Sequence, residues 1–143
     1  MIQGFSHIYL PVRDIDEAID FYTQKLGFSL LRQYTINGNP AAYVGLHGIL
    51  LEFSRSENTP SVDGRSELRI GLNVDDLDAT LAGLKSQGVA VPREPWQAMT
   101  FWGRQAQIMD PSGYRISLRE YRAPDSPHFE GWQPDQEGVV RLA

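Results

Sequence analysis

The sequence contains no cysteine, which excludes disulfides, thiolate metal ligands and thiol nucleophiles. This absence fits a reducing compartment, and the opening residues MIQGFSH lack the charged-then-apolar pattern of a secretory signal, so we expect a cytoplasmic location. No apolar run approaches the ~18 residues that a membrane-spanning helix needs, so we expect no membrane partner.

Blocks of basic residues are also absent. The 143 residues include 13 Lys and Arg against 18 Asp and Glu, which gives a formal net charge of −5. Because nucleic-acid binding depends on a clustered positive surface, we expect no nucleic-acid partner. With 41% hydrophobic and 22% charged residues, the composition is that of an ordinary globular protein.

What the chain does contain is a repeated pattern. Residues 7–12 alternate as a strand does, Asp14 is a good helix N-cap, and Gly27 is a good helix stop. A weaker copy starts with a strand at Leu68, and its corresponding cap and stop are Asp75 or Asp76 and Gly88. The pattern therefore predicts a strand followed by a helix in each half of the chain.

Three further strands are predicted after each helix. In the first copy they cover residues 28–36, 41–46 and 49–53, separated by the turn signals Asn37-Gly38 and His47-Gly48. In the second copy they cover residues 89–92, 101–109 and 114–120, with a loop at 95–100 and a turn at 110–113. Because one β-α-β-β-β unit cannot bury its sheet face alone, we expect the two copies to pair.

The expected organisation is a single domain over residues 1–121. It consists of modules 5–55 and 67–121, joined by a polar, breaker-rich linker at 56–66. The tail at 122–143 contains three prolines and has no clear period. It is either loose or docks through Phe129 and Trp132, on the body or on a second subunit, and the sequence does not decide between these.

Three stretches carry a resemblance to a known family: HIYLPVRDIDEAIDFYTQKLGF at 7–28, LEF at 51–53 and DPSGYRISL at 110–118. They resemble the vicinal oxygen chelate superfamily, which includes glyoxalase I, bleomycin-resistance proteins, fosfomycin-resistance enzymes and extradiol dioxygenases. The resemblance covers residues 5–121. It implies an α+β fold in which two βαβββ modules form one curved mixed sheet, the cup, with helices outside, and it implies a homodimer.

The resemblance places the metal-ligand positions of the superfamily at four residues: His7, Glu52, Arg69 and Ser117. Strand alternation independently points these side chains away from the helices, because the apolar residues of each strand, such as Ile8 and Leu10 after His7, fall on the opposite face. A neutral imidazole and a carboxylate are good ligands for a divalent metal, whereas a guanidinium has no lone pair to give. Two of the four positions, Arg69 and Ser117, are thus replaced.

Three interpretations of these positions are open. His7 and Glu52 are ordinary polar residues lining a wet cavity, or Arg69 takes the place of the metal by pairing with Glu52. In the third, a divalent metal binds through His7, Glu52 and water. We favour the second interpretation, in which no cofactor is needed. Glu52 is also a candidate catalytic general base, but the sequence leaves open whether the protein is an enzyme.

The neighbouring residues on these faces favour a small-molecule site. The candidate ligand-binding residues are His7, Tyr9, Glu52, Arg69, Asn73, Trp102 and Ser117. Arg115 and Arg119 share the face of Ser117, and such cations favour a ligand with a carboxylate or phosphate, unless they point into water. Trp96 and Trp102 are candidates for stacking on an aromatic ligand or for packing in the core.

We therefore expect a glyoxalase, bleomycin-resistance or dioxygenase-like protein that binds a small, anionic organic molecule in its cup. One alternative is a metal-dependent lyase, isomerase or dioxygenase that uses His7 and Glu52. A second alternative is a metal-free enzyme in which Glu52 is the general base.

Overall fold

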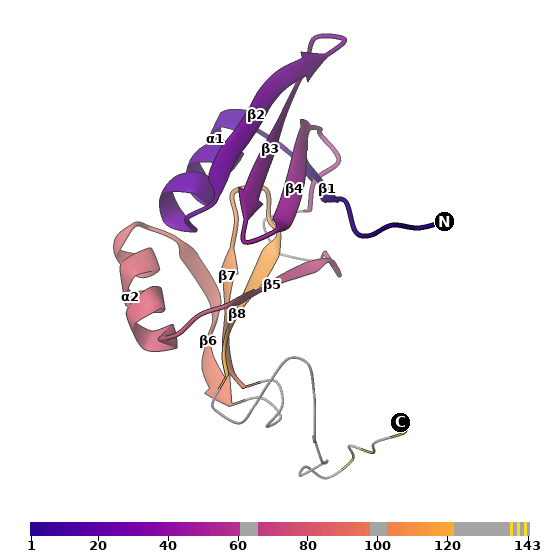
Figure 1. Cartoon of the computed structure of the whole chain (residues 1–143). Helices are drawn as coiled ribbons and strands as arrows, with labels where there is room; N and C mark the ends of the chain where they lie inside the picture. Colours follow the sequence, from indigo (N-terminus) through magenta and orange to yellow (C-terminus); the bar gives the residue numbers. More distant parts are fainter. Residues whose placement is uncertain (61–65, 98–102, 122–137, 139, 141, 143) are drawn as a thin grey trace. The chain divides into compact units, whose positions relative to one another are not determined.

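The computed structural model describes residues 1–60, 66–97, 103–121, 138, 140 and 142. The chain divides into two compact units, one of residues 1–67 and 110–114 and the other of residues 68–109 and 115–143. Each unit contains one four-stranded mixed sheet (Figure 1). The predicted α+β class, built from two βαβββ modules, is confirmed. No helix in the described part of the chain is long and apolar enough to cross a membrane.

The first unit has the strand order β1-β4-β3-β2. Strand β1 pairs in parallel with β4, and the other neighbours are antiparallel. Both predicted turns are tight two-residue hairpins, because Asn37 and His47 adopt φ angles of 51° and 46° and each precedes a glycine. The elements of this unit are β1 (Ile8–Val12), α1 (Ile15–Asp20), η1 (Phe21–Lys25), β2 (Ser29–Ile36), β3 (Asn39–Leu46) and β4 (Ile49–Arg55).

Helix α1 begins where the sequence predicts and changes form before its end. The Asp14 carboxylate accepts a hydrogen bond from the Glu17 backbone N–H at 2.9 Å, which confirms the predicted cap. After Asp20 the helix continues as the π-helical turn η1. Within η1, the Thr23 hydroxyl donates to the Ile19 carbonyl at 2.7 Å, and this side-chain bond competes with the regular backbone ladder.

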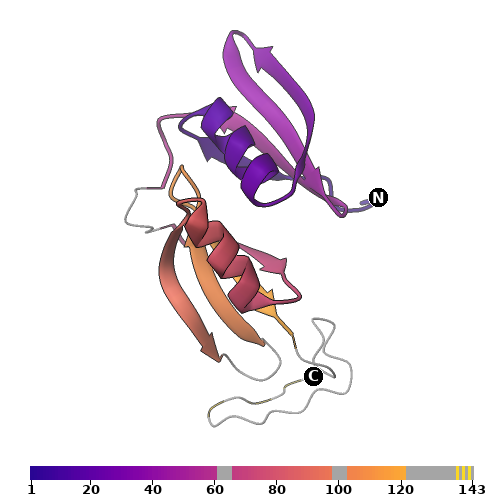
Figure 2. The same ribbon diagram turned by 90° about the vertical axis from the view of Figure 1, so that its left-hand side faces the viewer.

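The core of the first unit lies between helix α1 and one face of its sheet, as Figure 2 shows. Tyr22 and Phe53 are fully buried there, with ring centroids 5.0 Å apart. The turn at 110–114 belongs to this unit as well. Its Asp110 accepts a hydrogen bond from the Tyr22 phenol, and the Tyr114 phenol donates to the Pro11 carbonyl at 2.8 Å.

The second unit repeats the topology, with the strand order β5-β8-β7-β6. Asp76, one of the two predicted caps, accepts from the Ala79 N–H at 2.8 Å and begins the helix. The predicted apolar stripe Leu77, Leu81 and Leu84 is buried. The elements of this unit are β5 (Arg69–Asn73), α2 (Leu77–Ser86), β6 (Ala90–Gln97), β7 (Arg104–Met109) and β8 (Arg115–Glu120).

Strand β6 is longer than the sequence predicts. It runs to Gln97, so the predicted loop is wrong for residues 95–97, and residues 98–100 lie outside the described part of the chain. Pro92 and Pro95 lack backbone N–H donors, but β6 is an edge strand, where a missing N–H can face solvent. The pairing with β7 is correspondingly irregular around these residues.

Other predictions fall on residues that the structure does not describe. They are the central part of the linker at 61–65, and Phe129 and Trp132 in the tail.

Candidate functional site

In the first unit, strand alternation separates an apolar face from a polar one. Leu51 and Phe53 are fully buried on the side of helix α1, and Glu52 between them points to the opposite face. The pairing places Tyr9 on one side of Glu52 and Tyr43 on the other. Glu52 thus points away from helix α1, as the sequence predicts.

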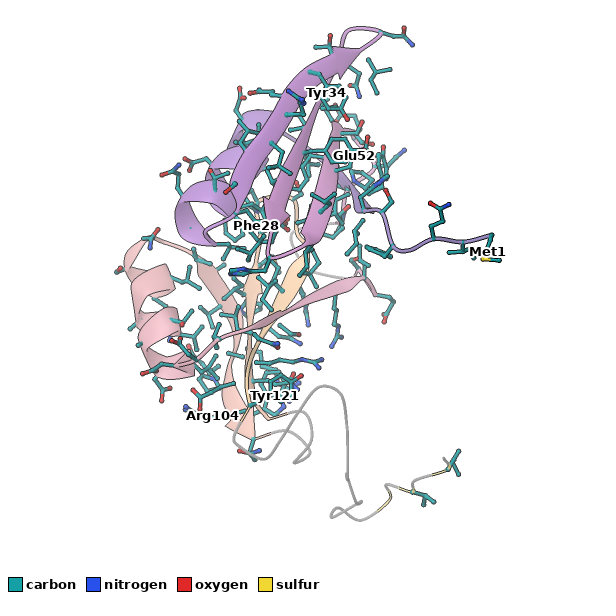
Figure 3. All side chains as sticks on the ribbon, in the orientation of Figure 1. Met1, Phe28, Tyr34, Glu52, Arg104 and Tyr121 are labelled. Atoms are coloured by element: carbon teal, nitrogen blue, oxygen red, sulfur yellow. The ribbon has the colours of Figure 1, made fainter. Side chains whose placement is uncertain are left out.

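Four side chains gather on this polar face and are called here the Glu52 cluster: His7, Tyr34, Tyr43 and Glu52. The His7 Nε2 atom lies 2.9 Å from Glu52 Oε2, and the Tyr34 phenol donates to Glu52 Oε1 at 3.0 Å. Figure 3 labels Tyr34 and Glu52 on the first unit. The Tyr43 ring packs edge-on against His7 at 5.6 Å and stacks on Tyr34 at 6.1 Å. Glu52 is 18% exposed, so the cluster remains open to a ligand.

The cluster also has a defined protonation pattern. Burial, followed by the hydrogen bond to Glu52, raises the pKa of Tyr34 to about 12. Burial and the Glu52 carboxylate also raise the pKa of Tyr43. Both phenols are therefore protonated at neutral pH, and Tyr34 acts as a hydrogen-bond donor. The arrangement offers a partly open carboxylate with an aromatic wall beside it.

The second unit has its own polar face, away from helix α2. Strand pairing places Gly71, Ser117 and Gln107 in one row across β5, β8 and β7. The next row holds Asn73, Arg119 and Gln105. Ser117, Gln105 and Gln107 are buried, whereas Arg69 and Asn73 at the edge strand are exposed. The predicted residues Arg69, Asn73 and Ser117 thus share one sheet face.

The remaining predicted residues have different outcomes. Tyr9 is 52% exposed on the face of the Glu52 cluster. Trp102 lies outside the described residues. Trp96 is covered by the Arg93 guanidinium at 3.6 Å from its ring centroid. Glu52 contacts His7 and Tyr34 of its own unit, and its pairing with Arg69 stays a prediction.

The donor set does not match the four-ligand metal site that the family resemblance implies. His7 and Glu52 are suitable ligands, but they contact each other, and the second Glu52 oxygen accepts from Tyr34. Arginine and serine stand at the other two implied positions, Arg69 and Ser117. Within the described ranges, no three or more His, Asp or Glu side chains are grouped so that they could hold a metal. Two ligands from this cluster would leave most of a coordination shell to water.

A separate surface cavity of about 930 Å³ lies in the first unit. It is lined by residues 13–16 at the start of α1, residues 33–35 of β2, residues 38–40, and Arg55. Of the Glu52 cluster only Tyr34 reaches it, and its polar side chains are bonded locally, as Gln33 is to Asp16 at 3.3 Å. The predicted site residues therefore lie elsewhere.

Sequence reasoning missed Tyr34 and Tyr43. The signal for Tyr43 was present, because a two-residue turn at His47-Gly48 fixes the pairing of β3 with β4 and puts Tyr43 opposite Glu52. Tyr34 is harder to predict, since the pairing of β2 with β3 shifts between Leu30 and Arg32.

Known proteins that are similar to this chain in sequence and those that are similar in structure point to the same superfamily. Residues 4–118 match the family model of the Glyoxalase/Bleomycin resistance protein/Dioxygenase superfamily. A probable lactoylglutathione lyase of Vibrio cholerae is 33% identical over 124 residues, which cover 78% of this chain and 86% of that protein.

Solved structures agree. TnmS3, an antibiotic binding protein from Streptomyces sp. CB03234, is 33% identical with a TM-score of 0.67, covering 85% of this chain and all of that one. FosX, a fosfomycin resistance protein from Listeria monocytogenes solved with Mn(II) and a dihydroxypropylphosphonic acid, shares the fold at 17% identity and a TM-score of 0.73, covering 87% of this chain and 97% of that one. The chain belongs to the glyoxalase/bleomycin resistance protein/dioxygenase superfamily.

Proposed function

We propose that this protein binds a small organic molecule on the helix-free faces of its sheets, without a metal. The observation that carries the proposal is the Glu52 cluster, in which a partly open carboxylate and imidazole stand beside two tyrosine rings. Aromatic walls with a few placed polar groups are typical of small-molecule sites. The likeness to TnmS3, an antibiotic binding protein, supports the same proposal.

The second unit, taken by itself, has a polar face that favours an anion. Arg69, Arg115 and Arg119 occupy the polar face of that unit together with Asn73 and Ser117. Guanidinium groups bind carboxylates and phosphates through paired hydrogen bonds, so a small organic anion is the preferred class.

We also propose, from the family resemblance, that the protein forms a homodimer, which sedimentation analysis of the purified protein tests directly.

A second candidate function is that of a metal-dependent lyase, isomerase or dioxygenase that uses His7 and Glu52. The Vibrio cholerae relative is a probable lactoylglutathione lyase, which favours a lyase, and both side chains are suitable ligands. A divalent metal would act there as a Lewis acid. The third candidate is a metal-free reaction with Glu52 as general base, for which the contact with His7 provides a path for the proton.

Ligand binding is tested by calorimetric titration with fosfomycin and S-lactoylglutathione, extended by an NMR screen of small aromatic and aliphatic fragments. The proposal expects saturable binding that perturbs the signals of Tyr34 and Tyr43. Glu52→Gln should change that affinity at least tenfold, because it alters both the charge of the cluster and the contacts with His7 and Tyr34. Glu57→Gln is the matched control, because this substitution makes the same chemical change at an exposed residue that pairs with Arg55. A screen without any saturable binder contradicts the proposal.

The competing functions are separated by elemental analysis of protein purified without chelators and then incubated with Zn²⁺, Ni²⁺, Mn²⁺ or Fe²⁺. Binding without metal predicts less than stoichiometric metal in every case. Stoichiometric metal that disappears in His7→Ala supports the metal-dependent enzyme instead. Turnover of S-lactoylglutathione that survives chelation and is lost in Glu52→Gln supports the metal-free enzyme.

A further inference from the structure

Two arginines on strand β8 have an unusual hydrogen-bonding state. The Nε atoms of Arg115 and Arg119 are both buried and have no hydrogen-bond partner among the described residues. Buried donors in folded proteins are nearly always paired, and an unpaired one on a charged group is destabilising. Two such groups, four positions apart on one strand and on the same face, call for an acceptor that the described chain does not supply.

The surroundings of these arginines explain how they come to be covered. The Arg119 Nε lies 3.8 Å from the point where a Cβ on Gly71 would stand, so the guanidinium lies over the glycine of the neighbouring strand. An Arg115 Nη atom donates to the Gln107 side chain at 3.5 Å, which is a long contact. Both guanidinium groups therefore lie along the polar sheet face, above the buried side chains of Gln107 and Ser117.

The charge on this face is all of one sign. Arg69 stands directly opposite Arg115 in the register of the parallel strands β5 and β8, which places two cations side by side. The described residues of β5, β7 and β8 that share this face include no Asp or Glu. The acid Glu120 lies at the other parity and accepts from the Leu77 N–H at 2.7 Å. A positive face without a counter-charge is less stable than one that holds an anion.

We infer that Arg115 and Arg119, assisted by Arg69, recognise the oxyanion of a ligand, such as a carboxylate or a phosphate group. An oxyanion meets the outer Nη atoms first. A rotation of each side chain then presents Nε–H and Nη–H together, which is the paired arrangement that carboxylates and phosphates accept. The inference rests on the proposed small-molecule function, because it names the ligand group that the second unit selects.

The test compares matched anionic and neutral probes on the full chain by NMR. Benzoate and inorganic phosphate are titrated in parallel with benzamide, which has the shape of benzoate without its charge, while the arginine Nε–H signals are followed. We expect benzoate to shift the signals of Arg115 and Arg119 and to bind at least tenfold more tightly than benzamide. Phosphate alone should shift the same two signals.

Variants identify the residues responsible. Arg119→Gln should remove the preference for benzoate, and Arg119→Lys, which keeps the charge and loses the paired geometry, should retain only part of it. Arg55→Gln is the control, since it removes the same charge from an exposed position of the first unit. Circular dichroism and thermal unfolding identify any variant that fails to fold, and in that case the Nε–H shifts of the wild-type protein decide.

The outcomes separate this inference from the proposed function. Equal binding of benzoate and benzamide, or anion binding that leaves both Nε–H signals unmoved, overturns the inference while small-molecule binding stands. Phosphate binding at the two arginines without any organic binder supports the inference and contradicts the proposed function. No response to any of the three probes overturns the inference.

Discussion

The Tyr22 phenol donates a hydrogen bond to Asp110 Oδ2 at 3.0 Å, although 88 positions separate the two residues in the chain. Both side chains are buried, and Asp110 Oδ1 also accepts the backbone N–H groups of Ser112 and Tyr114. The carboxylate therefore closes the 110–114 turn and joins it to the core beneath helix α1. Polar groups that are buried and fully bonded in this way give a fold specificity as well as stability.

Removal of the phenol should destabilise the protein. In Tyr22→Phe the Asp110 Oδ2 atom keeps its burial and loses its donor, so the free energy of unfolding should fall by about 1–3 kcal/mol. Urea unfolding followed by circular dichroism measures the change. Tyr9→Phe is the matched control and should change stability by less than about 0.5 kcal/mol, since Tyr9 is half exposed. Equal effects of the two variants would contradict the assigned role.

Asp110 should also give stability a characteristic pH dependence. Burial raises the pKa of its carboxyl above the ordinary 3.8, so the folded chain holds this proton more tightly than the unfolded chain. The stabilisation that this bound proton gives the folded state is fully present below pH 3.8. It is lost as the pH rises through the raised pKa of Asp110 in the folded chain. The free energy of unfolding of the wild type, minus that of Asp110→Asn, should fall over this interval. A difference that rises with pH would show the opposite shift.

Asp78 should behave in the reverse sense. The hydrogen bonds from Arg104, at 2.7 and 2.8 Å, lower the pKa of the Asp78 carboxyl below 3.8. Its stabilisation is present above pH 3.8 and is lost as the pH falls through the lowered folded value. Because the pair is exposed, its effect should be small and should shrink with added salt. A double-mutant cycle of Asp78→Asn and Arg104→Gln measures the coupling, which should vanish in acid, and a coupling that persists there would contradict this account.

Glu52 should control the titration of Tyr34. Part of the rise in the Tyr34 pKa, to about 12, comes from the Glu52 carboxylate, and burial supplies the largest part. In Glu52→Gln the pKa of Tyr34 should therefore decrease and remain above the ordinary 10.0. NMR of tyrosine labelled with ¹³C at the ring carbon bearing the hydroxyl follows this residue directly. Glu57→Gln should leave the titration unchanged, and an unchanged pKa in Glu52→Gln would argue against the contact.

The sequence was sufficient to predict the features that depend on neighbouring residues. The caps at Asp14 and Asp76, the buried stripe of α2 and the two tight hairpin turns all follow from short-range rules. The orientation of Glu52 and Ser117 follows from strand alternation alone. These predictions hold because each depends on a few adjacent positions and is not overridden by contacts elsewhere.

Other features depend on contacts that a local pattern does not contain. Strand β6 continues through Pro95 because it lies at a sheet edge, and its position in the sheet is not encoded in its own residues. Tyr34 reaches Glu52 only after an irregular step in the pairing of β2. Arg119 Nε packs over Gly71, one strand away, and this contact is not encoded in the residues next to Arg119.

The membership of residues 110–114 in the first unit has a consequence for fragments of this protein. A polypeptide ending at residue 67 would lack the acceptor for the buried Tyr22 phenol and the donor to the Pro11 carbonyl. Such a fragment should misfold or aggregate alone, and should recover its structure only by complementation with the remainder of the chain. The sequence repeat is therefore not a boundary between autonomous folding segments.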